Sequence, residues 1–252
     1  MDKLQRTHYK KENSLSKEWD TISSTRFEQL SNHKDLSFEY IIKPFILREL
    51  KKFDTSKVID IGCGTGNLSY LLKDSVDDLI GIDFSKKSVE LAKKLSQGIT
   101  NIQFYHSNIE DFHKKYKGAP FTLAISNMTL MDVSHLEEVL ASISNLLDSG
   151  GKLFFTIIHP CFWPKYKGYE NEAWYNYKEE IFIEGNFNIA LEKNQNLTTH
   201  IHRPLESYMK ALIKFGFNIE DFDELLPEKE FMNKFPSKIT YPRFLAITAK
   251  KK

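Results

Sequence analysis

A glycine-rich turn directly after a strand-like run is the feature that most restricts the fold of this chain. Residues 57–61, Lys-Val-Ile-Asp-Ile, are followed at once by Gly62, Gly64 and Gly66, and then by a helical pattern. A strand that opens through glycines into a helix brings backbone N–H groups and a helix N-terminus close to a ligand, because no side chains block the approach. The turn therefore predicts a strand–helix unit that binds a ligand.

Strand and helix patterns alternate along the rest of the chain. The expected strands are 57–61, 78–83, 102–106, 121–126, 152–158, 217–222 and 244–249. The expected helices are 67–73, 85–96, 134–147 and 204–215, preceded by a polar segment that is helical in pieces and by a helical pattern at 36–53 with Pro44 inside it. This β-α-β-α order predicts an α/β fold in which helices cover both faces of a doubly wound, mostly parallel sheet.

The composition is that of a globular protein, and it narrows the classes of partner. The chain has 252 residues, 41% of them hydrophobic, and 35 Lys and Arg nearly balance 34 Asp and Glu, for a net charge of +1. This balance disfavours a nucleic-acid groove. Cys63 and Cys161 form neither a disulfide framework nor a metal site. With no signal-peptide pattern and no apolar run long enough to cross a bilayer, a cytoplasmic protein without a membrane partner is the expectation.

An acidic residue at the end of the second strand narrows the ligand further. Asp83 can accept two hydrogen bonds from ribose hydroxyls, so the glycine turn and this carboxylate together indicate an adenosine-type cofactor. A nicotinamide dinucleotide remains an alternative, but Asn67 stands where its fingerprint needs a third glycine. Asp60 would oppose a pyrophosphate and would favour an ammonium group instead, directly or through water.

Residues 58–66, Val-Ile-Asp-Ile-Gly-Cys-Gly-Thr-Gly, resemble motif I of the class I S-adenosyl-L-methionine (SAM)-dependent methyltransferases. The resemblance continues through 80–85, 107–112 and 147–153, and covers about residues 36–159 and the tail from Arg203. It is strongest to the small-molecule branch, which includes ubiquinone/menaquinone-type and antibiotic-tailoring enzymes. It implies a Rossmann-like, seven-stranded sheet with an antiparallel last strand, and SAM as cofactor with S-adenosyl-L-homocysteine (SAH) as its product.

The resemblance also implies which residues bind the cofactor. Gly62 and Gly64 would approach the methionyl part, Asp83 would hold the ribose, and Phe84 would pack on adenine. Asn108, where many relatives have Asp, and the backbone of Ile109 would bind the adenine edge. The backbone of Asn127 would contact the methionyl amine, and Tyr40 would reach its carboxylate. The full predicted set is Asp60, Gly62, Cys63, Gly64, Gly66, Asp83, Phe84, Asn108, Ile109, Asn127 and Tyr40.

The chain is expected to be a single methyltransferase domain of four parts. These parts are an N-terminal helical cap (1–53), the SAM-binding core (54–160), an aromatic insertion or lid (161–202), and a C-terminal helix with the final strand pair (203–252). The insertion either stacks on the methyl acceptor and excludes water or packs as an ordinary covering of the sheet edge. Trp19 and Phe27 are candidates for closing the other side.

Two histidines are the candidate catalytic residues. His159 ends the fifth strand beside the expected methyl position and could act as a general base, or it could only line the pocket. His202, in the pair His200-x-His202, is the second candidate. A metal site is not expected, because a third ligand is missing and the Asp-rich site of catechol-type enzymes is absent.

The acceptor is expected to be a small molecule methylated on O, N or C. RNA or protein methylation and a non-catalytic SAM-binding sensor or scaffold remain alternatives, and the oligomeric state is not readable from the sequence.

Overall fold

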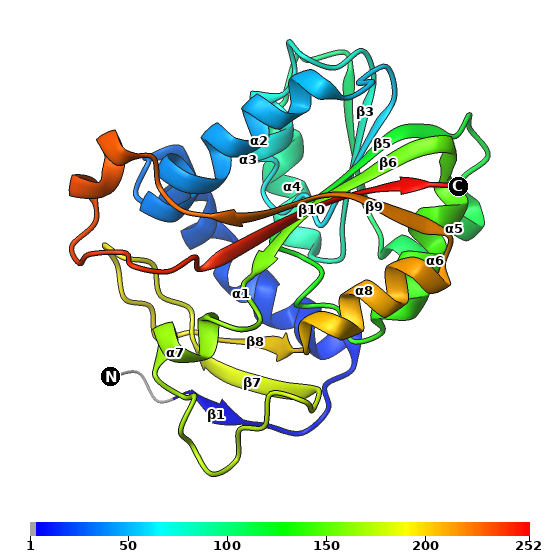
Figure 1. Cartoon of the computed structure of the whole chain (residues 1–252). Coiled ribbons are helices and arrows are strands. Elements are labelled where there is room, and N and C mark those ends of the chain that lie inside the picture. The colour runs from blue at the N-terminus through cyan, green and yellow to red at the C-terminus, as the bar shows by residue number, and fades with distance from the viewer. Residues whose placement is uncertain (1–3) are drawn as a thin grey trace.

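The computed structural model describes residues 4–252, and its centre is one seven-stranded sheet (Figure 1). The order of its strands is β4-β3-β2-β5-β6-β10-β9, and β10 runs antiparallel to both of its neighbours. The bounds are β2 Val58–Ile61, β3 Leu79–Asp83, β4 Ile102–His106, β5 Phe121–Asn127, β6 Leu147–Ile158, β9 Phe217–Leu225 and β10 Phe244–Lys251. The predicted fold class is confirmed. The division into four parts stays a prediction.

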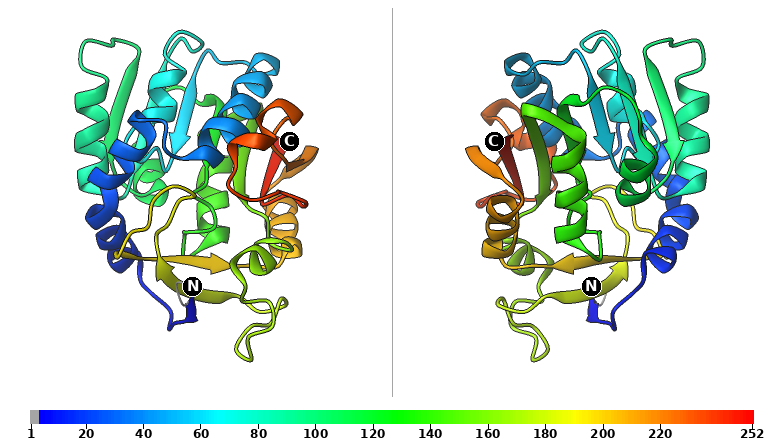
Figure 2. Two further views of the ribbon diagram at one scale, coloured as in Figure 1. Left: turned by 90° about the vertical axis from the view of Figure 1, so that its left-hand side faces the viewer. Right: turned by 90° about the vertical axis from the view of Figure 1, so that its right-hand side faces the viewer.

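Helices cover both faces of this sheet (Figure 2). Their bounds are α1 Glu12–Ser31, α2 Lys43–Glu49, α3 Asn67–Leu71, α4 Lys86–Leu95, α5 Ile109–Lys115, α6 Leu136–Leu146, α7 Trp163–Lys167 and α8 Leu205–Lys214. Helices α1, α3 and α4 contact one another, and α6 contacts both α5 and α8. Every residue of β2 and β3 is buried, as expected for strands with a helix layer on each side. None of the helices within residues 4–252 is long and apolar enough to span a bilayer.

A second, smaller sheet lies beyond the carboxyl ends of the central strands, at the bottom of Figure 1. It consists of β1 Gln5–Arg6, β7 Ile181–Asn186 and β8 Leu197–His202, all antiparallel. The predicted aromatic insertion is therefore partly β, and the N-terminus adds a strand that the sequence did not indicate. The backbone N–H of Ile201 donates to the carbonyl of Met131 at 2.7 Å, which joins this sheet to the loop after β5.

Several expected boundaries were wrong for local physical reasons. The polar N-terminal segment is one continuous 20-residue helix, because tertiary contacts stabilise a pattern that is weak alone. Pro44 has no N–H to donate to a helix, and the residues before it, Phe38–Ile42, form a π-helical turn. The backbone N–H of Lys43 donates to the carbonyl of Phe38. Leu50–Lys52 and Lys229–Lys234 are short 3-10 helices. Strand β6 starts at Leu147 rather than after the glycine pair, and α5 was not foreseen.

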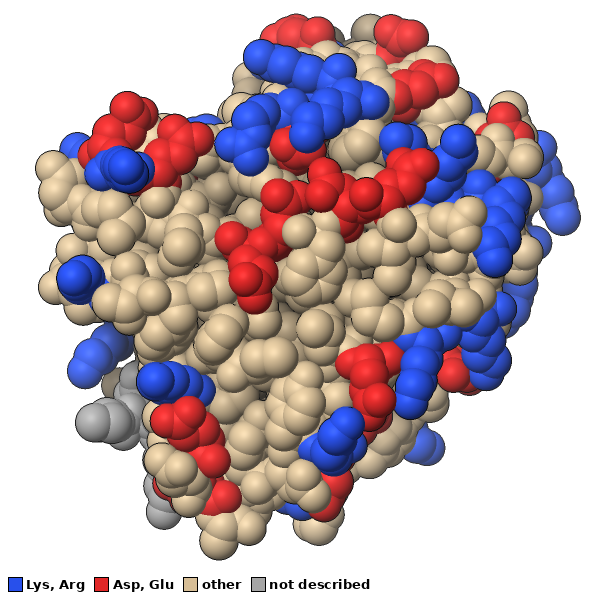
Figure 3. Space-filling model, viewed as in Figure 1, with Lys and Arg blue, Asp and Glu red and all other residues tan. Residues whose placement is uncertain are grey.

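The edge strand β9 carries acidic side chains. Glu220, Asp221 and Glu224 are exposed on it, and acidic groups form a band across the face shown in Figure 3. Charges on an edge strand oppose pairing with another chain, so this strand is protected against sheet extension.

Candidate active site

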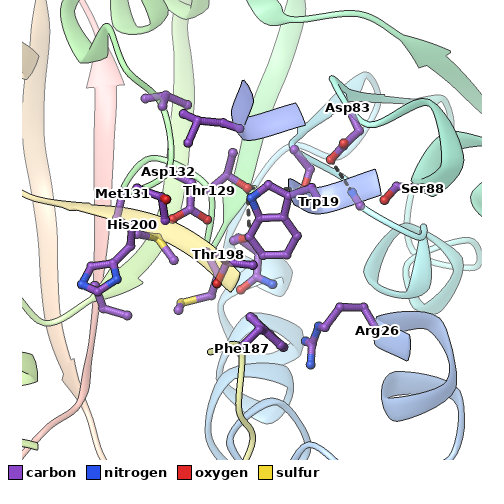
Figure 4. A pocket seen from close by; sticks show the side chains of 18 of the residues that line it. Trp19, Arg26, Asp83, Ser88, Thr129, Met131, Asp132, Phe187, Thr198 and His200 are labelled. Atoms are coloured by element: carbon purple, nitrogen blue, oxygen red, sulfur yellow. Dashed lines mark hydrogen bonds between the residues drawn. The ribbon is translucent and has the colours of Figure 1, made fainter. Parts of the chain in front are cut away.

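One cavity of about 350 Å³ opens at the carboxyl ends of β2, β3 and β5. The glycine turn, the loop after β5, one side of α1 and the β7–β8 hairpin with its loop all contribute to its wall. In parallel α/β sheets this is the edge at which ligands bind. Figure 4 shows Asp83 on one side of the cavity, Met131, Asp132 and His200 on the other, and Trp19 between them.

The structure brings most of the predicted cofactor residues together in this wall. Those that line the cavity are Gly62, Cys63, Gly64, Asp83, Phe84, Asn108, Ile109 and Asn127. The residues that lie outside the wall are Asp60, Gly66, Tyr40, His159 and His202.

The three glycines of the turn are needed for three different reasons. All have positive φ, at +71° for Gly62, +53° for Gly64 and +77° for Gly66, which other residues rarely adopt. A Cβ on Gly62 would lie 2.2 Å from Oγ1 of Thr129, and one on Gly66 would lie 2.7 Å from Cβ of Ala92. A Cβ on Gly64 would meet nothing within 4 Å. Gly64 therefore leaves bared backbone next to open space, whereas Gly66 serves helix packing.

Asp83 is buried beside this turn. Its Oδ2 accepts the backbone N–H of Gly64 at 2.8 Å, and its Oδ1 accepts that of Ser85 at 2.7 Å. Burial raises the pKa of Asp83 to about 6, with a smaller contribution from the charge of Asp20, against the two hydrogen bonds that lower it. A carboxylate oxygen has more than one lone pair, so both oxygens can accept further bonds from a ligand in the cavity.

Asp60 is placed differently from the expectation. Its carboxyl is buried below the turn, where Ser69 Oγ donates to it, and it does not line the cavity. Burial is the largest cause that raises its pKa to about 7. A direct contact with a ligand's ammonium group is therefore not available to Asp60. The thiol of Cys63 lines the cavity, and burial raises its pKa well above the usual value, so it is neutral.

Helix α1 closes the cavity beside Phe84 and Asn108. Asn108 caps α5, where its Oδ1 accepts the N–H of Asp111 at 2.8 Å, and its Nδ2 donates to Glu12 of α1 at 3.0 Å. Further along α1, Ser16 Oγ donates to the carbonyl of Phe84 at 2.8 Å. These contacts hold α1 across Phe84 and Asn108, the residues expected beside adenine.

Helix α1 also supplies cavity residues that the sequence analysis missed or only suggested. Trp19 lines the cavity and Phe27 does not. Arg26 faces the cavity with its guanidinium 3.1 Å from Asp35 and 4.9 Å from the ring centre of Phe187 (Figure 4). A polar helix position gives no sequence signal that distinguishes such an inward arginine from a solvated one.

Tyr40 lies at a separate, smaller cavity lined also by residues of β9. Its ring packs against Phe231 at 5.1 Å and Phe235 at 6.5 Å between centroids. Tyr40 therefore does not line the cavity with the other predicted cofactor residues, and its role at the cofactor carboxylate stays a prediction. The cations that do line the cavity are Arg26 and Lys167.

Neither predicted catalytic histidine faces the cavity. His159 Nδ1 accepts the N–H of Cys161 at 3.2 Å, and its Nε2 donates to Glu224 at 2.9 Å. His202 Nε2 donates to the carbonyl of Tyr177 at 3.0 Å. Burial lowers the pKa of both. The general-base role proposed for them therefore has no support from this geometry.

His200 lines the cavity instead. Burial lowers its pKa to about 3, so the imidazole is neutral. It lies two residues before His202 on β8, so both share one face of the small sheet, and only the position along the strand decides which one reaches the cavity. That position depends on the pairing of β8 with β7, which the sequence did not reveal.

The donor set of this wall fits SAM. Gly64 leaves space for a ligand against its backbone, Asp83 supplies acceptor oxygens for hydroxyls, and Phe84 supplies a flat apolar surface. Within residues 4–252 no group of three or more His, Cys, Asp or Glu side chains is arranged to hold a metal ion.

Comparison with known proteins agrees with this site. Residues 52–205 match a family described as a methyltransferase domain. An uncharacterized protein of Haemophilus influenzae is 26% identical over 227 residues, which cover 84% of this chain and 88% of that protein. A ubiquinone biosynthesis O-methyltransferase of Aromatoleum aromaticum is 28% identical, over 56% of this chain and 57% of the relative. A mouse arsenite methyltransferase is 27% identical, over 52% and 38%. Each named enzyme is matched over less than two thirds of its own length.

Solved structures share the fold. A SAM-dependent methyltransferase from Mesorhizobium loti has a TM-score of 0.61 at 19% identity, covering 82% of this chain and 97% of that one. One from Clostridium acetobutylicum has a TM-score of 0.59 at 17% identity, covering 92% and 98%. Since the family match spans more than half of the chain and the motifs and fold agree with it, the chain belongs to the methyltransferase domain family and is a SAM-dependent methyltransferase.

Proposed function

We propose that this enzyme methylates a small molecule held in the same cavity as the cofactor. The observation that carries the proposal is that Asp83 and the glycine turn form one side of a single cavity, while Met131, Asp132 and His200 form the other. The β7–β8 hairpin and α1 cover this space, so an acceptor of limited size would be enclosed with the cofactor.

The chain's own residues would then act by positioning. Bound SAM supplies a methyl group on a sulfonium centre. Asp83 would accept the ribose hydroxyls, the backbone at Gly62 and Gly64 would lie along the methionyl part, and Phe84 with Asn108 would hold the adenine. Arg26 would pair with the methionyl carboxylate. Alignment of the acceptor with that methyl group and exclusion of water provide most of the rate that an enzyme of this type needs.

The surface charge supports a small acceptor over RNA. On the face shown in Figure 3, Lys and Arg lie in separate groups around the acidic band and form no continuous basic surface. A protein that binds a nucleic-acid backbone needs such a surface.

Calorimetric titration with SAH, together with transfer of label from methyl-labelled SAM to a metabolite extract, tests the proposal. We expect SAH binding and label in small molecules. Asp83→Asn should weaken SAH binding by about 1.5–3 kcal/mol, because charge-assisted hydrogen bonds are lost. Asp148→Asn removes the same charge at an exposed site and should change nothing. Label in RNA or protein, or SAH binding without any transfer, would contradict the small-molecule assignment, and an absence of SAH binding would contradict the cofactor site.

A further inference from the structure

Asp132 is a buried carboxyl group with nothing bonded to it. It lies in the loop after β5, is 6% exposed, and lines the cavity. Its backbone N–H donates to the carbonyl of Thr129 at 2.8 Å, but no hydrogen bond or ion pair reaches its carboxyl group from any of residues 4–252. The carboxyl oxygens are accessible from the cavity, unlike the sealed, unpartnered Oε2 of Glu18. Figure 4 shows the side chain directed into the space beside Trp19 and Met131. A buried carboxyl without a partner is costly, so a partner from outside the chain is the natural explanation.

The charges around Asp132 compensate it only in part. The charge of Arg203 lowers the pKa of Asp132, but the guanidinium donates to Glu180 at 2.6 Å and to the carbonyl of Val133 at 2.6 Å. The charge of Glu18 on α1 raises the pKa of Asp132. Glu18 itself keeps one buried oxygen, Oε2, without a hydrogen-bond partner among the described residues. Desolvation is the largest cause that raises the pKa of Asp132 well above its usual value.

Lys10 pairs with two carboxylates next to this region. Lys10 Nζ donates to Glu18 at 2.6 Å and also to Glu184. His200, which lines the same part of the wall, is neutral because burial lowers its pKa. Lys167 of α7 also lines the cavity, and its charge helps to lower the pKa of His200. The Asp132 carboxyl group, which has no ion pair within residues 4–252, is the group on this side with which a positively charged ligand would pair.

Aromatic side chains complete this part of the wall. Trp19 and Phe187 meet edge to face with ring centres 5.8 Å apart, and Trp163 lines the cavity with its Nε1 buried and unpaired among the described residues. Aromatic faces attract cations and pack against hydrocarbon, so the wall suits a ligand with an apolar body and a charged head.

We infer that the methyl acceptor is a small amine whose amino group binds to Asp132. This inference rests on the proposed function and names the acceptor class of the same site. The acceptor enters as an ammonium ion and pairs with the Asp132 carboxylate. One N–H bond then breaks and an O–H bond forms on Asp132, which leaves the nitrogen lone pair free to face the sulfonium methyl group. A carboxyl whose proton affinity is raised by burial is suited to take up this proton.

A matched pair of ligands tests the inference. The SAH-saturated protein is titrated with phenethylamine and with phenethyl alcohol, which share an apolar body and differ in the head group. We expect the amine to bind at least about tenfold more tightly than the alcohol, since only the amine gains a charge pair.

Variants separate the charge from the shape of the site. Asp132→Asn keeps the shape and should weaken amine binding at least about tenfold, with alcohol binding changed less than about twofold. Asp148→Asn, at an exposed position, should change neither. Alcohol bound as tightly as the amine, no detectable binding of the amine, or an unchanged preference in Asp132→Asn would overturn the inference. The two titrations of the wild-type protein test the inference even if a variant does not fold. Because the protein is saturated with SAH beforehand, a lack of amine binding contradicts the acceptor assignment and not the cofactor site.

Discussion

Thr129 fills the space that a side chain on Gly62 would need. Its Oγ1 lies 3.3 Å from the carbonyl oxygen of Gly62, to which it donates, and 2.2 Å from the position of a Cβ on that residue. The contact joins the turn after β2, where we expect the cofactor, to the loop after β5, which carries Asp132. The distance between the two halves of the cavity is therefore set by a glycine and a threonine that pack against each other.

Gly62→Ala should unfold more easily than Gly64→Ala. Both substitutions place a side chain at positive φ, at a cost of about 1–2 kcal/mol. Only Gly62→Ala also collides with Thr129, which adds about 1–3 kcal/mol of overpacking. Gly64→Ala should instead lose SAH affinity, because its Cβ enters the cavity. Denaturant unfolding and calorimetry check both, and equal unfolding costs would show that the Thr129 contact is not restrictive.

The affinity for SAH should depend on the ionisation of Asp83. Burial raises the pKa of Asp83 to about 6, so below that pH the carboxyl is protonated and loses its charge-assisted acceptance of hydroxyl hydrogen bonds. Affinity should be constant above pH 6 and should then fall by up to about tenfold per pH unit. Asp83→Asn should bind weakly with a flat pH profile between pH 5 and 8. A wild-type profile as flat as that of the variant would argue against the ribose contact.

Asp60→Asn should stabilise the protein at high pH. The pKa of Asp60 is raised to about 7, so between pH 4 and 7 the folded protein binds its proton more tightly than the unfolded chain does. The free energy of unfolding therefore falls as pH rises through this window, and the ionised group opposes folding above it. Asn removes this penalty, for a gain on the order of 2 kcal/mol at pH 8 that shrinks toward pH 4. Denaturant unfolding at pH 8 and pH 4, with Asp148→Asn as control, measures this gain. A lower free energy of unfolding for Asp60→Asn than for the wild type at pH 8 would mean that the Asp60 carboxylate stabilises the fold.

His200 should make the free energy of unfolding depend on pH in the opposite direction, so that stability falls as the pH is lowered. Its pKa is lowered to about 3, so between pH 6.5 and 3 the unfolded chain binds more protons than the folded protein. The stability that it supports is complete above pH 6.5 and is lost as pH falls through that window. Relative to pH 8, His200→Gln should lose less stability at pH 5 than the wild type, by about 2 kcal/mol. His8→Gln, at an exposed position, should follow the wild type, and a His200 variant that also did so would indicate a solvated imidazole.

His159→Ala distinguishes the catalytic hypothesis from the structural one. Because the imidazole bonds Glu224 and the backbone of Cys161 outside the cavity, we expect the free energy of unfolding to fall by about 1–3 kcal/mol. Turnover per folded molecule and SAH affinity should stay close to those of the wild type. Unfolding and label transfer by the same preparation check both. A large loss of turnover with stability retained would restore His159 as a general base.

The local structure was predictable where neighbouring residues decide it. The strand at 57–61, the glycine turn and Ser85 as the cap of α4, which accepts the N–H of Ser88 at 3.1 Å, all depend on contacts close in the chain. Strand β1 was not predictable, because two exposed residues have no pattern and exist as a strand only through their pairing with β7.

The sequence by itself determined the class of fold, the order of the central strands along the chain and the glycine turn with Asp83 beside it, because periodicity, φ preference and short-range spacing are local properties. Only the tertiary structure decided that His200 and Asp132 face the cavity while His159, His202 and Tyr40 do not. Those positions depend on how β8, the loop after β5 and the segment before Pro44 pack against distant parts of the chain. Burial and ionisation, which give these side chains their chemistry, come from that packing.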